Sequence, residues 1–140
     1  MGLPEDKGYE EIEHAADWAF QVRGRDLQEL FTNAARAMCS MEQGEPEAET
    51  TTITRELQVE GVDREGLLVN WLNEILYLEQ AKRESYHRFD IIEIDATHLR
   101  ARVYGAPAEN RQGRIKAVTF HNLEVKKTAG GWEATVVADV

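Results

Sequence analysis

The spacing of apolar residues constrains the fold of this chain most strongly, because it changes along the sequence between the period of a helix and that of a strand. From Asp26 to Met41, apolar residues recur at spacings of three and four. They are Leu27, Leu30, Phe31, Ala34 and Met38. Asp26 and Glu29 form a capping-box pattern at the start of this segment, and Gly44 interrupts it. The pattern predicts an amphipathic helix followed by an acidic loop over residues 42–49.

A second helical pattern follows a short alternating segment. Residues 51–59 alternate between apolar and polar, which predicts a half-buried strand that Gly61 ends. Helical spacing then returns, with Asp63 as the expected N-cap and an end near Glu84. Its apolar residues are Leu68, Trp71, Leu72, Ile75 and Leu76. The sequence therefore predicts two amphipathic helices.

The remaining patterned segments alternate with the period of two that is typical of strands. All segments predicted as strands are 9–13, 18–23, 51–59, 89–95, 99–104, 115–127 and 132–140. The fourth and fifth form a hairpin around Asp95, and a Gly130-Gly131 turn joins the last two. We expect one α+β domain over residues 1–140. Its mixed or antiparallel sheet of about six or seven strands would pack one face against the two helices.

Charge limits the classes of partner that the chain can bind. Sixteen Lys and Arg residues oppose 26 Asp and Glu residues, which gives a net charge of −10. Such a surface repels a phosphate backbone, so tight and direct binding of nucleic acid is not expected. Basic proteins and divalent cations suit it better. The charge could also serve only to keep the protein in solution.

Targeting and cysteine usage both favour a cytoplasmic protein. No run of about 18 apolar residues occurs, so no membrane-spanning helix is expected. The N-terminal residues lack the basic-then-apolar pattern of a signal peptide. Cys39 is the only cysteine, which excludes a disulfide framework and a thiolate zinc site within one chain. We expect Cys39 to pack as a small apolar residue.

Sequence motifs give no support for an enzyme. The chain contains no P-loop, no G-x-G-x-x-G, no paired C-x-x-C and no H-E-x-x-H. It also lacks the interleaved basic and aromatic residues that bind single-stranded RNA. We therefore expect no catalytic residues.

One candidate site lies at the break between the first two predicted strands. Residues 13–17 place His14 between the carboxylates of Glu13 and Asp17. Loops held by a rigid sheet often bind ligands. An Asp that caps a turn and a His that covers the sheet edge would explain the same residues.

A second candidate site lies at the chain end. The alternation of the last strand places Asp139 on the face opposite to Trp132, and Val140 adds its terminal carboxylate. Two adjacent anions repel each other unless a divalent cation or a partner's Arg lies beside them. A frayed terminus is the alternative. His121 shares the strand register of Ile115 and Val125, which favours a core or edge histidine over a ligand.

Several runs of this sequence together resemble the archease family. They are Tyr9–Asp17, Gly24–Phe31, Leu72–Tyr77, Ile115–Leu123 and Val136–Val140. Archeases are similar in size and have a sheet-and-two-helix α+β fold. The resemblance implies an accessory protein of the RtcB-type tRNA-splicing ligase, which promotes guanylylation of the ligase and so restores multiple turnover in tRNA splicing and RNA repair. The sequence departs from the family at Ala15, where Thr is common, and at Trp18, where a small aliphatic residue is usual.

The resemblance also implies a metal site. In the family a divalent cation, seen as calcium, is held by residues that match Asp17, Asp139 and Val140 here. Such oxygen ligands select calcium, magnesium or manganese over zinc. Residues that would contact the site or the partner are Glu13, His14, His121 and Lys116.

Two other functions are compatible with the same residues. One is a chaperone for tRNA-modifying enzymes such as tRNA methyltransferases, which has also been suggested for the family. The other is a metal-dependent hydrolase in which Asp17 and Asp139 hold the ion and His14 acts as a base.

Overall fold

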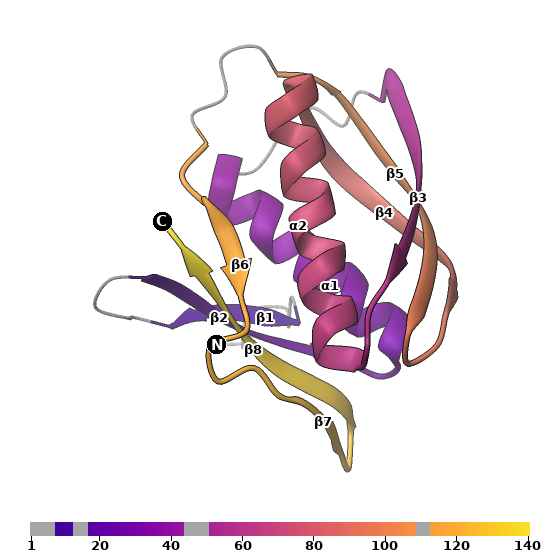
Figure 1. The fold of residues 1–140 in the computed structure, drawn as a ribbon, viewed down its shortest axis with the longest axis vertical. Coiled ribbons are helices and arrows are strands. Elements are labelled where there is room, and N and C mark those ends of the chain that lie inside the picture. Colours follow the sequence, from indigo (N-terminus) through magenta and orange to yellow (C-terminus); the bar gives the residue numbers. More distant parts are fainter. Residues whose placement is uncertain (1–7, 13–16, 44–50, 109–112) are drawn as a thin grey trace, which may run out of the picture.

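Two antiparallel β-sheets enclose two helices in the computed structural model of the chain, which describes residues 8–12, 17–43, 51–108 and 113–140 (Figure 1). The helices are α1 (Leu27–Gln43) and α2 (Arg64–Lys82). The five-stranded sheet contains β1 (Tyr9–Ile12), β2 (Asp17–Gly24), β8 (Gly131–Asp139), β6 (Ala117–Thr119) and β7 (Val125–Thr128). The three-stranded sheet has the order β3 (Ile53–Glu60), β5 (His98–Pro107), β4 (Glu84–Ile94). The predicted α+β class is confirmed.

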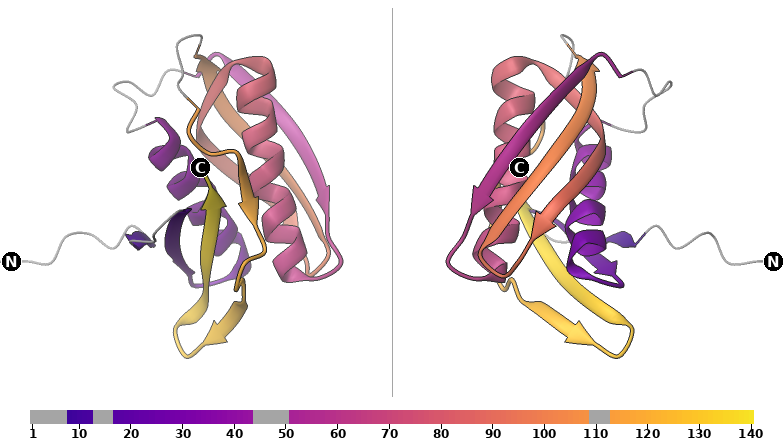
Figure 2. Two further views of the ribbon diagram at one scale, coloured as in Figure 1. Left: turned by 60° about the vertical axis from the view of Figure 1, so that its left-hand side comes forward. Right: turned by 90° about the vertical axis from the view of Figure 1, so that its right-hand side faces the viewer.

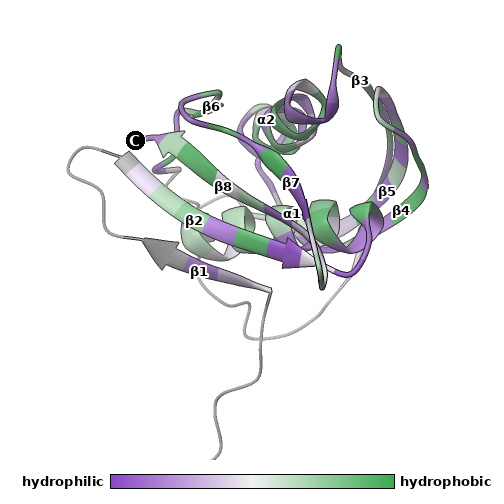
Figure 3. Cartoon of the chain, turned by 90° about the horizontal axis from the view of Figure 1, so that it is seen from below, coloured by the Kyte–Doolittle hydropathy of each residue, from purple (hydrophilic) through white to green (hydrophobic). Residues whose placement is uncertain are grey.

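The helices lie between the two sheets, whereas the sequence predicted a single sheet with helices on one face (Figure 3). Helix α1 packs against β2 of one sheet and β4 of the other, and α2 packs against β3, β4 and β6. The described residues form eight strands instead of six or seven. The alternation of a strand reveals which face is buried but not which strand it pairs with, so it could not divide the strands between two sheets.

The core between the sheets consists of large side chains from both helices and both sheets. The largest fully buried ones include Phe20, Phe31, Trp71 and Tyr86. The indole N–H of Trp71 donates a hydrogen bond of 3.0 Å to the backbone oxygen of Phe31, which ties α2 to α1. Cys39 is buried in the same core, as predicted. No helix in the described part of the chain is long and apolar enough to cross a membrane.

Both helix starts follow the predicted capping residues. Asp63 accepts a hydrogen bond of 2.7 Å from the backbone N–H of Gly66, and Asp26 accepts one of 2.8 Å from the N–H of Glu29. The Glu29 carboxylate accepts the backbone N–H of Arg25, one residue before the cap, and also binds the Arg25 guanidinium. These bonds lower the pKa of Glu29. Helix α2 ends before Glu84, which instead begins β4.

The segment predicted as one strand over residues 115–127 is broken in the structure. Strands β6 and β7 both pair with β8, but along different parts of it. Between them the chain turns at Asn122, which has a φ of 51°. His121 is exposed at this turn, so the prediction that it continues the strand register into the core or edge is wrong. Alternation on both sides of a short turn resembles a single strand, which explains the error.

An ion pair between half-buried Arg55 and buried Glu84 connects the two outer strands of the three-stranded sheet. The guanidinium of Arg55 on β3 donates to both oxygens of Glu84 on β4, at 2.9 and 2.6 Å. The hydroxyl of Tyr86 donates to the same carboxylate. The hydrogen bonds from Arg55 hold the pKa of Glu84 below its usual value even though burial opposes the shift. The charged carboxylate is therefore the form that the fold stabilises.

Replacing Arg55 with Met should destabilise the protein, because Glu84, which is only 7% exposed, would lose its counter-charge. Urea unfolding measures this loss. Arg102→Met is the matched control, since both partners of the Arg102–Glu56 ion pair lie on the surface and its removal should cost less stability than the removal of Arg55. Equal losses for the two variants would contradict the proposed role of burial.

The cost of Arg55→Met should also depend on pH. A carboxyl whose folded pKa is lowered stabilises the fold above its unfolded pKa and loses that contribution on acidification. The difference between the wild type and the Arg55→Met variant should therefore shrink as the pH falls below about 4. A difference that is constant from neutral to acidic pH would contradict this.

Candidate metal centre

The pairing of β2 with β8 brings the two predicted site segments together. Their antiparallel register runs from the pair Asp17 and Asp139 to the pair Gly24 and Trp132. Figure 2 shows β8 between β2 and β6, with the chain end at its tip. Direct partners in a sheet belong to the same face, so positions 17 and 139 share a face at the end of the strand pair. Two residues from opposite ends of the sequence thus become neighbours.

The chain end is held in place by β6 on its other side. Ala117 is the direct partner of Asp139, and the N–H of Lys116 donates a hydrogen bond of 2.7 Å to the Asp139 carbonyl. Strand β8 remains paired through its last residue, unlike the frayed terminus considered as the alternative. The Asp139 side chain is exposed, and it forms no ion pair with any residue that the structure describes.

The predicted alternation of β8 holds over most of the strand, but Val137, on the same face as Asp139, is buried as well. Ala134, Val136 and Ala138 are buried against the helices, whereas Asp139 is exposed. Asp17 begins β2, whereas the sequence placed it in the break before that strand. The difference matters because strand pairing fixes the backbone of Asp17 against β8.

The other predicted site residues have different positions. Lys116 is exposed beside the chain end and contacts it through its backbone N–H. His121 lies beyond the far end of β6, because β6 runs antiparallel to β8 from Ala117 at Asp139 to Thr119 at Val137. The structure therefore does not bring His121 to the chain end. Glu13 and His14 lie outside the described residues.

Helix side chains that the sequence did not single out hold the segment beside the chain end. Both oxygens of buried Glu42 accept backbone N–H groups, from Arg114 at 2.9 Å and from Ile115 at 2.8 Å. Gln80 donates to the Ile115 carbonyl at 3.0 Å. Glu42 was predicted to lie in the acidic loop but belongs to the last turn of α1.

Asn73 of α2 completes this support. Its amide oxygen accepts the N–H of Val118 at 2.8 Å, and its amide nitrogen donates to the Val118 carbonyl at 3.1 Å. The side chain thereby satisfies both backbone groups on the edge of β6 that faces away from β8. Asn73 stands next to Leu72 in an apolar helical pattern, and a polar residue in that setting is the signal that could have identified it.

Trp18 lies one residue from Asp17 and opposite Ala138 in β8. The guanidinium of Arg114 lies 6.0 Å from the centre of its ring, within the range of a cation–π contact. The sequence resemblance implied that Trp18 replaces a small aliphatic residue, and the structure places its ring beside Arg114. It packs the end of β2 against the segment that Glu42 holds.

The donor set at the chain end suits a hard cation. The predicted ligands Asp17, Asp139 and the Val140 terminus would contribute only carboxylate oxygens, which calcium, magnesium and manganese prefer. Among the described residues, no three His, Cys, Asp or Glu side chains gather as a metal site. The predicted set differs from such a cluster because it combines two side chains with a chain terminus.

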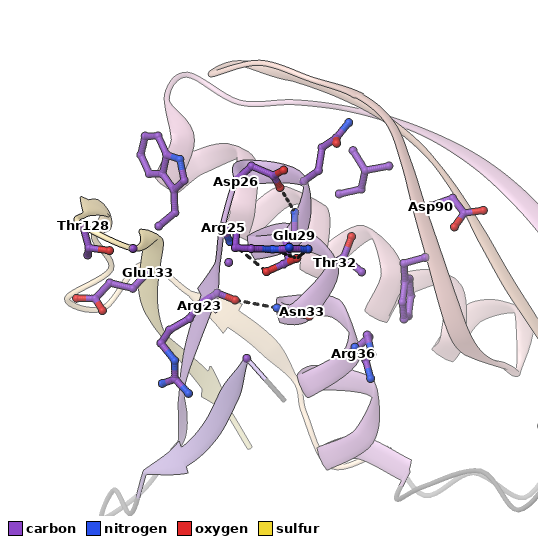
Figure 4. Close-up of a pocket in the computed structure, with 17 residues that line it drawn as sticks. Arg23, Arg25, Asp26, Glu29, Thr32, Asn33, Arg36, Asp90, Thr128 and Glu133 are labelled. Carbon is purple, nitrogen blue, oxygen red and sulfur yellow. Dashed lines mark hydrogen bonds and ion pairs between the residues drawn. The ribbon is translucent and has the colours of Figure 1, made fainter. Parts of the chain in front are cut away.

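A broad groove lies at the opposite end of the β2–β8 pair (Figure 4). Arg23 and Arg36 line it together with the acidic side chains of Asp26 and Glu133. The Arg25 guanidinium there is paired with Glu29 at 2.8 Å. Since charges of both signs are mixed, the groove is not selective for an anion or a cation.

Comparisons with known proteins support the resemblance seen in the sequence. The Archease protein family (MTH1598/TM1083) matches residues 9–140. An archease from Methanosarcina mazei is 36% identical over 142 residues, which cover 96% of this chain and 97% of that protein. The solution structure of protein 1598 from Methanobacterium thermoautotrophicum is 30% identical, with a TM-score of 0.77, and covers 96% of this chain and 100% of that one.

A second solved structure resembles the fold at lower identity. It is the crystal structure of an archease from Thermotoga maritima that is described as a possible chaperone. It is 23% identical to this chain, has a TM-score of 0.64 and covers 100% of this chain and 99% of that one. At this identity the comparison supports the fold alone.

Replacing Asn73 with Ala should loosen β6, because two backbone groups of Val118 would lose their partners at a cost of about 1–3 kcal/mol. Amide hydrogen exchange at Val118 should accelerate more than exchange in the core of α2. Asn70→Ala removes one exposed hydrogen bond, to the Glu60 carbonyl, and serves as the control. Unchanged exchange at Val118 in the Asn73 variant would contradict the role of this side chain.

Proposed function

Because this chain belongs to the archease family, we propose that it is an accessory protein that binds a divalent cation at its chain end and activates an RNA ligase of the RtcB type. It would promote guanylylation of the ligase and so sustain multiple turnover in tRNA splicing and RNA repair. The observation that carries the proposal is the register that makes Asp17 the direct partner of Asp139, one residue before the C-terminus.

The proposed ligands are Asp17, Asp139 and the terminal carboxylate of Val140, with calcium as the first candidate and magnesium or manganese as alternatives. The backbone at this end is ordered by pairing on both sides of Asp139. Ordering before binding reduces the entropy that a ligand set loses when it closes around an ion. A bound cation would neutralise phosphate charge during nucleotidyl transfer.

The charge of the chain supports a protein partner over an RNA partner. A net charge of −10 disfavours contact with a phosphate backbone and favours contact with a basic surface. Enzymes that bind RNA carry such surfaces. The chain would therefore act on the ligase itself, and the ligase would contact the RNA.

A chaperone for tRNA-modifying enzymes such as tRNA methyltransferases is the second candidate, since the Thermotoga maritima structure is described as a possible chaperone. The two functions differ in stoichiometry and metal dependence. A chaperone would suppress aggregation of its client in stoichiometric amounts, without a divalent ion. An activator of the ligase would act on a folded enzyme and would depend on the site at the chain end.

A guanylylation assay with the cognate ligase tests the proposal, and the expected result is more guanylylated ligase when this protein is present. Asp139→Asn should abolish activation and cation binding, while the thermal midpoint changes little because the side chain is exposed. Asp17→Asn should have the same effect. The matched control is Glu133→Gln, a carboxylate on the same face of β8 at its other end.

Two results would contradict the proposal. One is activation by the Asp139 variant at the wild-type level. The other is a loss of activation that only follows a loss of thermal stability. If the isolated protein transferred nucleotide at a rate proportional to its own concentration, it would be an enzyme and not an accessory protein.

A C-terminal tag should inactivate the protein more than an N-terminal tag. The tag would convert the Val140 carboxylate into an amide and so remove one of three proposed anionic ligands. Titration calorimetry with calcium, followed by the ligase assay, compares untagged, N-tagged and C-tagged protein. Equal cation affinity and equal activation for the C-tagged form would exclude a role for the terminal carboxylate.

A further inference from the structure

Exposed large apolar side chains gather on one face of the molecule. Among the described residues, five such side chains are at least one-third exposed. Three of them border β6 or the chain end: Tyr77 is 61% exposed, Phe120 is 59% exposed and Val140 is 38% exposed. The two aromatic side chains of the set are thus both in this region.

Their positions follow from the contacts that hold β6. Asn73 and Gln80 of α2 hydrogen-bond the backbone of Val118 and Ile115, so this stripe of the helix borders β6. Tyr77 lies four residues after Asn73 and three before Gln80, which places it on the same stripe. Phe120 directly follows β6. Figure 1 shows α2, β6 and the chain end side by side. We call Tyr77, Lys116, Phe120, Asp139 and Val140 the β6 face.

The β6 face differs from the solvent-facing side of the three-stranded sheet. There, exposed charges are paired with each other, as in Arg88 with Asp90, Arg100 with Glu93 and Arg102 with Glu56. On and next to the β6 face, neither Glu74 nor Asp139 forms an ion pair with a residue that the structure describes. Aromatic side chains are enriched at the surfaces that protein partners cover. The unpaired acidic groups beside them leave a local negative charge that a basic partner could neutralise.

We propose that the β6 face is the surface that docks onto the ligase, with Tyr77 and Phe120 as its apolar anchors. This inference rests on the proposed function. The partner's surface would offer apolar pockets for the two rings and positive charge for Glu74, Asp139 and the C-terminus. Docking through this face brings the proposed metal site against the partner, because Asp139 and Val140 are part of it.

Charge favours the ligase over a second copy of this chain as the occupant. Two copies would each bring a net charge of −10 and the same unpaired carboxylates to the interface. Like charges that face each other across an interface oppose association. A basic nucleic-acid enzyme offers the complementary sign and also gains speed of association from it.

The test compares Tyr77→Ser, Phe120→Ser and their double variant with two control variants. Val62→Ser and Ile92→Ser remove exposed apolar side chains of 92% and 37% exposure outside the β6 face. Calorimetry measures the Kd for the ligase, and the guanylylation assay measures the concentration that gives half of maximal activation. The double variant should raise both the Kd and the half-maximal concentration by at least about tenfold, as expected for aromatic anchors. Both quantities should stay within about twofold of the wild-type values in the control variants.

Calcium affinity and the thermal midpoint are measured on the same variants. Both should stay at wild-type values, since neither ring is buried nor a proposed ligand. A double variant that binds and activates the ligase like the wild type would overturn the docking surface. So would a loss of ligase binding that only parallels a loss of thermal stability.

Direct binding separates this inference from the proposed function. If the wild-type protein binds the ligase through Tyr77 and Phe120 but does not promote guanylylation, the docking surface stands and the proposed activity fails. If the wild type activates and the double variant activates equally well, only the docking surface fails. Self-association of the wild type that the double variant loses, with ligase binding unchanged, would identify a second copy as the occupant and overturn the proposal.

Discussion

The pairing of β2 with β8 is the constraint on which the rest of the structure depends. It joins segments near the two ends of the sequence over eight residue pairs, from Asp17 with Asp139 to Gly24 with Trp132. Helix α1 packs on β2, and β6 and β7 both need β8 as their partner. Such a non-local pairing costs more chain entropy to form than a hairpin. The burial of apolar side chains between this sheet and the helices must therefore stabilise it. The proposed metal site is a consequence of the same register.

The second constraint is the support that the helices give to β6. A strand of three residues with one partner strand is too short to be stable by itself. Glu42, Asn73 and Gln80 satisfy backbone groups before and within it, and Glu65 accepts the N–H of Val125 where β7 begins. Each helix thus buries an apolar face and also supplies polar groups to a neighbouring edge. The supported segment in turn holds the chain end, because the Lys116 N–H donates a hydrogen bond to the Asp139 carbonyl.

The sequence predicted the elements better than their arrangement. The caps at Asp26 and Asp63, the β4–β5 hairpin and the alternation over most of β8 depend on local spacing, and the structure agrees. The break at Asn122 was missed because β6 and β7 alternate on both sides of it. The two-sheet arrangement and the role of Glu42 depend on which segments meet in space. The resemblance to the archease family named the three proposed ligands, but only strand pairing shows how positions 17 and 139 become neighbours.

The chain end combines features that a fold does not need for its own stability. Asp139 is exposed, and removing an exposed carboxylate rarely costs more than about 0.5 kcal/mol. Its direct partner in the strand register is a second aspartate, Asp17. The residues that immediately precede Asp139 (Val136, Val137 and Ala138) are all buried, so they and not Asp139 supply the stability of this end of β8. The fold alone thus gives no reason for the exposed Asp139 or for the exposed rings of Tyr77 and Phe120, which is why we propose a cation for the first and a partner protein for the second.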